Sequence, residues 1–170
     1  MSNTSYLYHT YQIHGFKHVR TYYGEGEILF YIRHAESHIR CPECRTGNVV
    51  KNGCRKRIFR LTPSGRKKQA VCLSVQRIIC RECAFKGQLP VPFAKPGASY
   101  VKCFERYALD LLKFGTIDHA AHHLGVGWDM IKDIQKADLK KRFDKPPLKN
   151  LTIIAIYRVP LRFREIIRHS

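Results

Sequence analysis

Four cysteines stand at spacings typical of a metal site. They form two CxxC pairs, CPEC at residues 41–44 and CREC at residues 80–83. A pair of this spacing can present two thiolates to one ion from a tight turn, and four sulfur ligands suit tetrahedral Zn²⁺. The 35 residues between the pairs have β character, so hairpins can bring the pairs together. The predicted ligands of one structural zinc ion, in a zinc ribbon, are Cys41, Cys44, Cys80 and Cys83.

Other roles for the cysteines stay open. The two pairs could be buried or redox-active thiols, although neither precedes a helix in the βαβ context of a thioredoxin-like motif. His38, three residues before Cys41, is an alternative ligand. Cys54, Cys72 and Cys103 stand alone, so we expect each to pack in an apolar environment. A total of seven cysteines fits reduced thiols better than a secreted disulfide framework.

The segment between the two pairs is strongly basic. From Arg45 to Arg81 the chain carries eleven Lys and Arg residues and no acidic residue. Such a run is often only a solvated surface, but like charges without counter-charges repel one another, and phosphates relieve that repulsion. Phosphate contacts of this kind position a protein without reading sequence. The predicted contacts are Arg55, Lys56, Arg57, Lys67 and Lys68.

A second nucleic-acid signal lies in residues 116–143. Thr116 is a plausible helix N-cap, and Gly125 suits the positive φ of a turn between two amphipathic helices. This pattern predicts a helix-turn-helix, with a plain helical hairpin as the alternative. We expect Trp128 to be packed, and the adjacent His122 and His123 to lie on the surface. The predicted major-groove and phosphate contacts are Asp129, Lys132, Gln135, Lys136 and Lys140.

The periodicity of the chain indicates which elements position these residues. Residues 16–35 predict a β-hairpin around Gly24–Gly26, and residues 68–79 alternate at period two, as a strand does. The Pro- and Gly-rich stretch 89–99 breaks both helix and sheet, so we place the main boundary there. Beyond it the apolar residues fall on a helical stripe, and helices are predicted as far as about residue 143.

Composition narrows the class of partner. The 170 residues carry 31 Lys and Arg against 13 Asp and Glu, which gives a formal net charge of +18 at pH 7. A charge this large predicts a polyanionic partner, and nucleic acid leads that class. No stretch approaches the roughly 20 apolar residues of a membrane span, and the N-terminus lacks a signal-peptide layout. We therefore expect a cytoplasmic protein without a membrane partner.

The order of these motifs resembles the N-terminal half of bacterial insertion-sequence transposases of the ISL-three family. The resemblance runs from about Tyr6 to Ile156 and rests on CPEC, VQRIICREC, LGVGWD with the following IKDI, and PPLKNLTIIAI. It implies a zinc ribbon and a helix-turn-helix that bind the terminal inverted repeats of the element as double-stranded DNA, in association with the bacterial nucleoid. It also implies that a ribonuclease-H-like nuclease with a DDE triad and Mg²⁺ follows.

In this resemblance the run LTIIAI at residues 151–156 corresponds to the strand that delivers the first catalytic Asp. Tyr157 and Arg158 stand where Asp-Glu is expected. We therefore expect no catalytic residue, no DNA cleavage and no strand transfer from this chain alone, and a truncation or frameshift after Ile156. Mg²⁺ would belong only to the missing nuclease domain. The expected protein partners are a second copy of the chain or the full-length transposase.

The predicted fold class is α+β: a β-hairpin and a zinc ribbon, then an all-α helix-turn-helix module and an unpartnered C-terminal strand and tail. The predicted divisions are an N-terminal β-hairpin region at 1–40, a zinc ribbon at 41–88, a linker at 89–98, a helix-turn-helix domain at 99–145 and a truncated nuclease start at 146–170.

Three functions follow as hypotheses. The first is the DNA-binding portion of a transposase that recognises terminal inverted repeats without transposition activity of its own. The second is a free-standing zinc-ribbon and helix-turn-helix transcriptional regulator. The third is a basic RNA-binding zinc protein, for which the helix-turn-helix segment is a poor fit.

Overall fold

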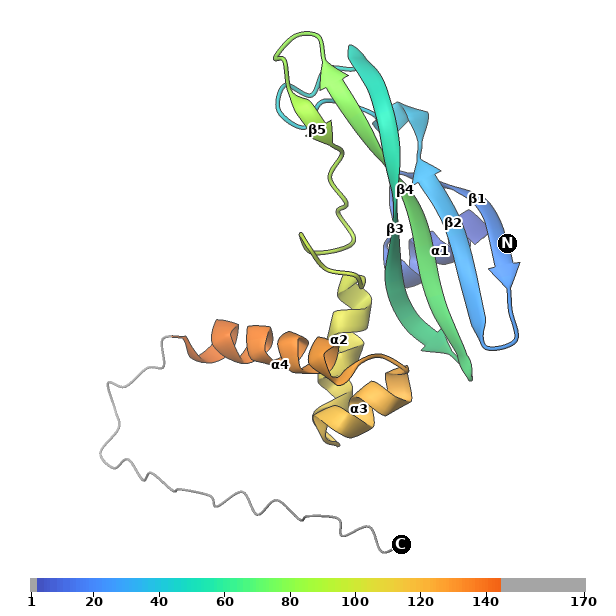
Figure 1. Cartoon of the computed structure of the whole chain (residues 1–170), viewed down its shortest axis with the longest axis vertical. Helices are drawn as coiled ribbons and strands as arrows, with labels where there is room; N and C mark the ends of the chain where they lie inside the picture. The colour runs from blue at the N-terminus through green and yellow to red at the C-terminus, as the bar shows by residue number, and fades with distance from the viewer. Residues whose placement is uncertain (1–2, 145–170) are drawn as a thin grey trace, which may run out of the picture.

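The computed structural model describes residues 3–144, which form four α-helices and one mixed β-sheet (Figure 1). This confirms the α+β class. The elements are α1 (Asn3–Tyr11), β1 (Phe16–Tyr23), β2 (Glu27–His34), a 3₁₀ turn (Glu36–His38), β3 (Val49–Ser64), β4 (Lys67–Cys80), β5 (Lys86–Gln88), α2 (Lys102–Leu111), α3 (Ile117–Leu124) and α4 (Trp128–Phe143). The predicted C-terminal strand and tail lie outside the described residues.

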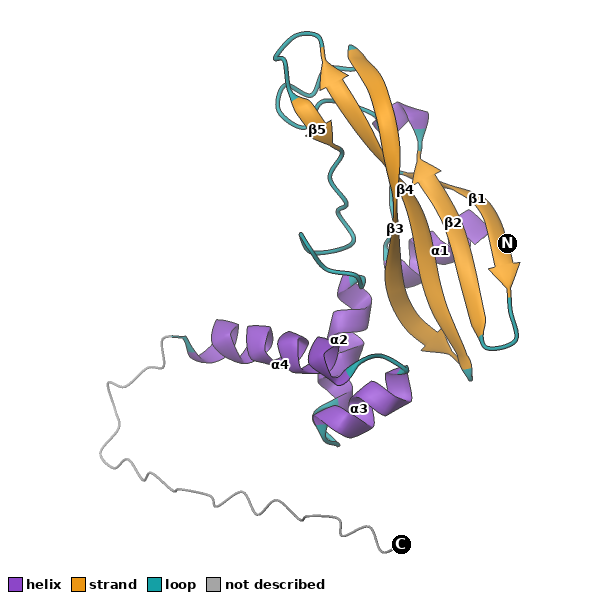
Figure 2. Cartoon of the chain, viewed as in Figure 1, coloured by secondary structure: helices purple, strands orange, loops and turns teal. Residues whose placement is uncertain are grey.

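The sheet is built around β4. Its strand order is β1-β2-β4-β3, with β5 pairing to β4 beyond the end of β2. β1 and β2 form the hairpin predicted at 16–35, and β4 covers the strand predicted at 68–79. All neighbouring strands are antiparallel except β2 and β4, which pair in parallel (Figure 2). After β2 the chain crosses to the side of β4 that lies away from β2, and there it runs back as β3. The β3–β4 hairpin then reverses the direction again, so β4 runs parallel to β2.

Burial along β4 follows the alternation read from the sequence. Val71, Leu73 and Val75 are buried in the main core, as predicted from their period of two. Cys72, on the opposite face, is also buried. Its register partners, Tyr31 on β2 and Ile58 on β3, lie on the same face and flank this small side chain, so strict alternation of exposure is lost at the centre of the sheet.

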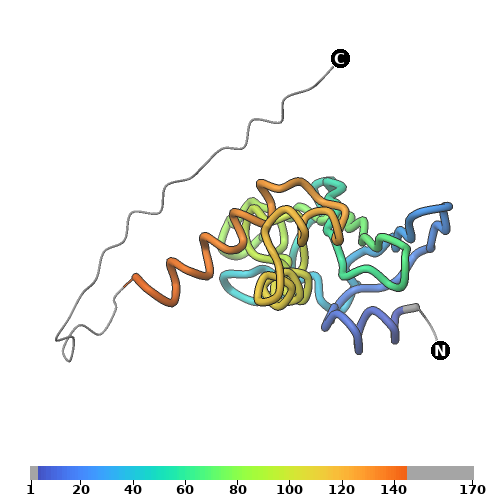
Figure 3. Tube along the Cα trace, turned by 90° about the horizontal axis from the view of Figure 1, so that it is seen from below, coloured from blue at the N-terminus to red at the C-terminus, as the bar shows by residue number. Residues whose placement is uncertain are grey.

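Helix α1 packs on one face of the sheet (Figure 3). Its Leu7 and Tyr11 are buried, and the Tyr11 hydroxyl donates to Oε1 of the buried Gln69 on β4 at 2.6 Å. The same hydroxyl lies 3.1 Å from the carbonyl oxygen of Thr62 on β3. Burial is the main reason that the pKa of Tyr11 is raised, so the hydroxyl stays protonated and serves as a donor.

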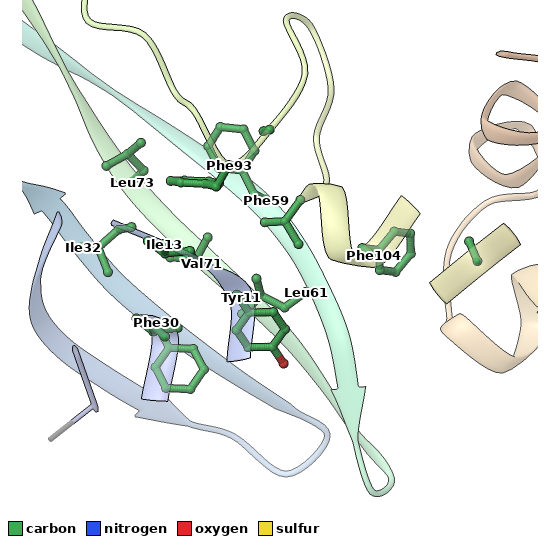
Figure 4. Close-up of a cluster of buried hydrophobic side chains, with 14 of the residues drawn as sticks. Tyr11, Ile13, Phe30, Ile32, Phe59, Leu61, Val71, Leu73, Phe93 and Phe104 are labelled. Atoms are coloured by element: carbon green, nitrogen blue, oxygen red, sulfur yellow. The ribbon is translucent and has the colours of Figure 1, made fainter. Parts of the chain in front are cut away.

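One contiguous hydrophobic core joins the sheet to the helices (Figure 4). The connection between β5 and α2 contributes to it, because the buried Phe93 packs edge-on against Phe16 of β1 and Phe59 of β3. A second, smaller cluster contains Ile39, Ile78 and Leu89. The segment predicted as a linker is therefore packed against the sheet.

The three C-terminal helices bury short apolar faces against one another. Thr116 accepts a hydrogen bond from the backbone N–H of His119, which confirms the predicted N-cap of α3. Gly125 ends α3 with φ 59°, as predicted, in a conformation that favours glycine. Ile131 and Ile134 of α4 are fully buried. From this anchored turn, α4 projects away from the sheet (Figure 1).

Candidate metal centre and basic surfaces

The antiparallel pairing of β3 with β4 brings the two CxxC pairs together. The first pair lies in the connection that leads from β2 into β3, and the second begins at the last residue of β4. Val49, the first residue of β3, pairs with Cys80. The turn before β3 and the turn after β4 therefore meet at the same end of the sheet.

The four sulfur atoms of Cys41, Cys44, Cys80 and Cys83 lie within 4.8 Å of one another and could hold a metal ion. The Sγ atoms of Cys41 and Cys83 are 3.4 Å apart, and those of Cys44 and Cys80 are 3.5 Å apart. A disulfide needs about 2.05 Å between sulfurs. A tetrahedral site with metal–sulfur bonds of about 2.3 Å has sulfurs about 3.8 Å apart. The two CxxC pairs thus bring four unlinked sulfurs to distances that are far from a disulfide and close to those of a tetrahedral metal site.

The two turns have the same backbone conformation after the second cysteine. The residue after each pair, Arg45 and Ala84, has a left-handed φ of 60° and 57° respectively. This reversal returns the chain to the cluster: the N–H of Cys41 donates to the Thr46 carbonyl at 2.9 Å, and the N–H of Cys80 donates to the Phe85 carbonyl at 2.8 Å. Left-handed residues other than Gly cost energy, so packing elsewhere must hold both turns.

Backbone amides activate one of the four thiols. The amide of Cys83 is the main cause that lowers the pKa of Cys80 to about 7, with help from the amide of Glu82. For Cys83 a backbone hydrogen bond from Phe85 acts in the same direction, but desolvation and the neighbouring thiols raise the pKa to about 12. The lowered pKa favours the thiolate of Cys80, which is the form that binds metals.

A small apolar cluster supports the second turn. Phe85 packs against the core of Ile39, Ile78 and Leu89. Its ring lies so close to Gly87 that a Cβ on Gly87 would come within 2.6 Å of the Phe85 Cζ atom. Glycine at this position therefore permits the Phe85 ring to pack in this small cluster.

Other candidate ligands and thiols lie outside this cluster. His38 is not part of it; its ring contacts Gly15, and its Nδ1 lies 3.1 Å from the Ser37 hydroxyl. Cys72 is buried, as expected. Cys103 is partly buried, whereas Cys54 is exposed. The expectation of apolar packing is wrong for Cys54 because it follows a β-bulge on β3, where the strand is open to solvent.

The predicted basic contacts of the hairpin divide into two kinds. Arg55 and Lys56 on β3, and Lys67 and Lys68 at the hairpin tip, are exposed. Arg57 is different: it is half-buried, donates to the Ala98 carbonyl at 2.9 Å and lies 4.8 Å from the centre of the Phe59 ring. In this structure Arg57 ties β3 to the β5–α2 connection.

On α4, the five predicted contacts are also not equivalent. Lys136 and Lys140 are exposed and Gln135 is half-buried. Asp129 and Lys132 bind each other at 2.6 Å, and the Lys132 ammonium lies 4.7 Å from the centre of the Trp128 ring. The Trp128 side chain is 47% exposed, so the expectation that it is packed is wrong. Its position in the first turn of α4 leaves it beside Lys132 at the surface.

Two features of the structure have no signal in the sequence. His34 is buried beside the Phe16 ring, and its Nε2 has no hydrogen-bond partner within the described residues. Arg66 and Lys68 at the β3–β4 tip meet His122 and His123 of α3 across a cleft of about 520 Å³. Period and spacing describe local structure, so they cannot reveal contacts between segments this far apart in the chain.

Among residues 3–144 no helix has the length and apolar character needed to cross a membrane.

Comparison with known proteins finds no relative of this chain. No family model matches the chain, and neither a curated protein nor a solved structure matches it.

Proposed function

We propose that this protein binds duplex DNA selectively through a helix-turn-helix formed by α3 and α4, and that a structural zinc ion stabilises the ribbon beside the cysteines. The observation that carries the proposal is that α4 has a buried apolar face and an exposed cationic face. Ile131 and Ile134 face the helical core, while Lys136 and Lys140 are exposed. A helix divided in this way can enter a major groove with its cationic side toward base edges and phosphates.

The turn between the helices supports the same function. The left-handed Gly125 and the cap at Thr116 give α3 a defined end and a defined start. The buried Ala120, Ala121 and Leu124 allow α3 to approach its neighbours closely. A rigid pair of helices is needed for selective binding, because base contacts require side chains at fixed positions.

Zinc is the metal that fits the sulfur cluster best. All four candidate ligands are thiols, and soft thiolate ligands in a tetrahedral arrangement favour zinc or iron–sulfur chemistry over hard cations. A site with four protein ligands has no open position for a substrate, so the ion is structural. It would clamp the two turns that the β3–β4 pairing brings together.

The charge of the protein supports a duplex partner as well. A formal charge of +18 provides non-specific attraction to phosphates, and α4 provides the selective part. We propose that the selected duplex is a terminal inverted repeat of an insertion sequence, so the chain acts as the DNA-binding portion of a transposase. A transcriptional regulator would instead select an operator.

The test is selection of duplexes from a random library, followed by titration of the enriched sequence and a scrambled one. Specific DNA-binding proteins prefer their site by about 10³-fold or more. We expect enrichment of one sequence and comparable selectivity, with weaker binding to an RNA hairpin of the same length. Equal affinity for enriched and scrambled duplexes would contradict selective binding, and preference for RNA would favour an RNA-binding protein.

A matched pair of lysine variants tests α4 as the reading helix. Lys136→Ala removes an exposed charge from α4, whereas Lys113→Ala removes a charge that is paired with Asp110 at 2.6 Å next to α2. If Lys136 contacts a base, we expect Lys136→Ala to weaken binding to the enriched duplex by about 1–3 kcal/mol. Lys113→Ala should bind as the wild type does. Equal behaviour of the two variants would exclude Lys136 from the interface.

A further inference from the structure

The tip of the β3–β4 hairpin and the turn after α3 enclose one cleft. It is lined by Pro63, Gly65, Arg66, Lys68 and residues 121–126 of α3 and the following turn, and its volume is about 520 Å³. The sheet and the helices are far apart in sequence, so this is a site that neither part has alone.

Backbone geometry holds the two walls together. Gly65 has φ 58° and forms, with Arg66, the tight turn between the paired Ser64 and Lys67. On the other wall Gly125 lies against Lys68: a Cβ on Gly125 would come within 2.1 Å of the lysine Cε atom and 2.5 Å of Nζ. The Lys68 ammonium therefore extends from the hairpin onto the α3–α4 turn.

The cleft is lined by two cationic side chains and by no carboxylate that could neutralise them. Arg66, Lys68, His122 and His123 line it, and none of its lining residues is acidic. Within residues 3–144, neither Arg66 nor Lys68 forms an ion pair. Other surface lysines of the chain do pair with carboxylates, so these two cations at one cleft are best neutralised by an anion from outside.

We propose that this cleft binds a backbone phosphate of the same DNA duplex that α4 reads, so that the hairpin tip and the helices act as one clamp. The proposal rests on the proposed function. A phosphodiester fits better than a nucleotide, because the cleft is open, is lined by the cations Arg66 and Lys68 and, apart from the histidines, contains no aromatic ring on which a base could stack. A phosphate contact here fixes the orientation of the duplex without reading its sequence.

The experiment titrates the full chain with the enriched duplex and with the scrambled duplex at several salt concentrations. Arg66→Ala and Lys68→Ala are compared with Lys86→Ala, which removes an exposed lysine from β5 near the cysteine end of the sheet. Each lost phosphate contact lowers the slope of log affinity against log salt by about 1. We expect this change, and roughly tenfold weaker binding of both duplexes, for the two cleft variants but not for Lys86→Ala.

The double variant Arg66→Ala/Lys68→Ala tests whether the two side chains share one phosphate. If they do, the double variant should lose less affinity than the product of the two single losses, because the effects of groups with a common partner are not independent. Thermal unfolding checks that each variant folds; both side chains are exposed, so little change is expected.

Each result decides one question. If the wild type selects a duplex and the cleft variants keep its affinity and salt slope, the clamp is overturned while the proposed function stands. The clamp is also overturned if the cleft variants bind the enriched duplex more weakly but the scrambled duplex as the wild type does, because that result would indicate base recognition. If the wild type binds no duplex, the proposed function and the clamp fail together.

Discussion

At the level of single residues, the cysteines differ in what surrounds the sulfur. Cys80 and Cys83 have sulfur neighbours and backbone amides that favour the thiolate of Cys80. Cys54 is exposed on β3 and lies outside the cluster. The same side chain is thus a ligand candidate in one place and a plain surface thiol in another.

This difference predicts the result of two serine substitutions. Cys83→Ser removes one of the four sulfurs, so we expect metal affinity to fall by more than the roughly 10–100-fold typical of losing a supporting hydrogen bond. Cys54→Ser should keep one metal ion per chain. Metal content after dialysis, measured by atomic spectroscopy, checks both variants. Full metal retention by Cys83→Ser would remove Cys83 from the ligand set.

The buried His34 predicts a pH dependence of stability. Desolvation, followed by the charge of His38, lowers the pKa of His34 below its usual 6.5. As pH falls through about 6.5 the unfolded chain takes up a proton that folded His34 resists, so stability is lost on acidification. His34→Phe keeps a ring at the position and removes the titration.

The measurement is the drop in melting temperature between pH 7.5 and pH 5.5. We expect a larger drop for the wild type than for His34→Phe. Acid effects on the cysteine cluster are common to both proteins, so the difference belongs to His34. Equal drops would show that His34 titrates alike in the folded and unfolded chains.

At the level of elements, some were predictable because their signal is local. Val71, Leu73 and Val75 alternate, Thr116 caps a helix, and Gly125 permits a left-handed turn. Helix α1 was not predicted. Its sequence, NTSYLYHTY, has few aliphatic residues, and contacts such as that of Tyr11 with Gln69 hold it in place. A helix that depends on a distant partner carries little local signal.

The contact between α1 and β4 predicts the effect of one hydroxyl. Tyr11→Phe removes the nearer of two hydroxyl donors to the buried Gln69 Oε1, the other being Tyr6 at 3.3 Å, so we expect a loss of about 0.5–1.5 kcal/mol in the free energy of unfolding. Tyr8→Phe, on the exposed side of α1, is the matched control and should change little. Urea denaturation measures both. A neutral Tyr11→Phe would mean that another donor replaces the hydroxyl.

The turn after β4 predicts a requirement for glycine. In Gly87→Ala the new methyl group would meet the Phe85 ring, so the ring must shift from its place against Ile39, Ile78 and Leu89. We expect a loss of about 1–3 kcal/mol, as for other overpacked sites. Gly47→Ala, where nothing lies within 4 Å, is the control. Equal melting temperatures for the two variants would contradict this packing.

At the level of the whole molecule, the protein has two apolar clusters of unequal size. The larger joins the sheet, α1 and the three C-terminal helices, and the smaller contains Ile39, Ile78 and Leu89 near the cysteines. Local spacing located the cysteine centre, but the parallel pairing of Phe30 with Val71 was not predictable. That pairing depends on how the chain crosses the sheet, which leaves no periodic pattern.

The two clusters predict a local response to metal removal. A chelator should release the turns at 41–49 and 80–89, while the large core keeps the helices folded. Hydrogen exchange is therefore expected to speed up in those turns and to stay slow at Val71, Leu73, Ile131 and Ile134. Metal-loaded chelator is the control. Loss of protection throughout the chain would show that one cooperative unit includes the metal site.

The parallel pairing of β2 with β4 also affects how the protein is synthesised. Residues of β2 leave the ribosome first, but their partners on β4 follow roughly 40 residues later, and the sheet cannot close before they emerge. During that interval the apolar side chains of Phe30 and Ile32 have no β4 to cover them. During that interval the nascent hairpin is open to aggregation, and a chaperone that covers it would protect the chain.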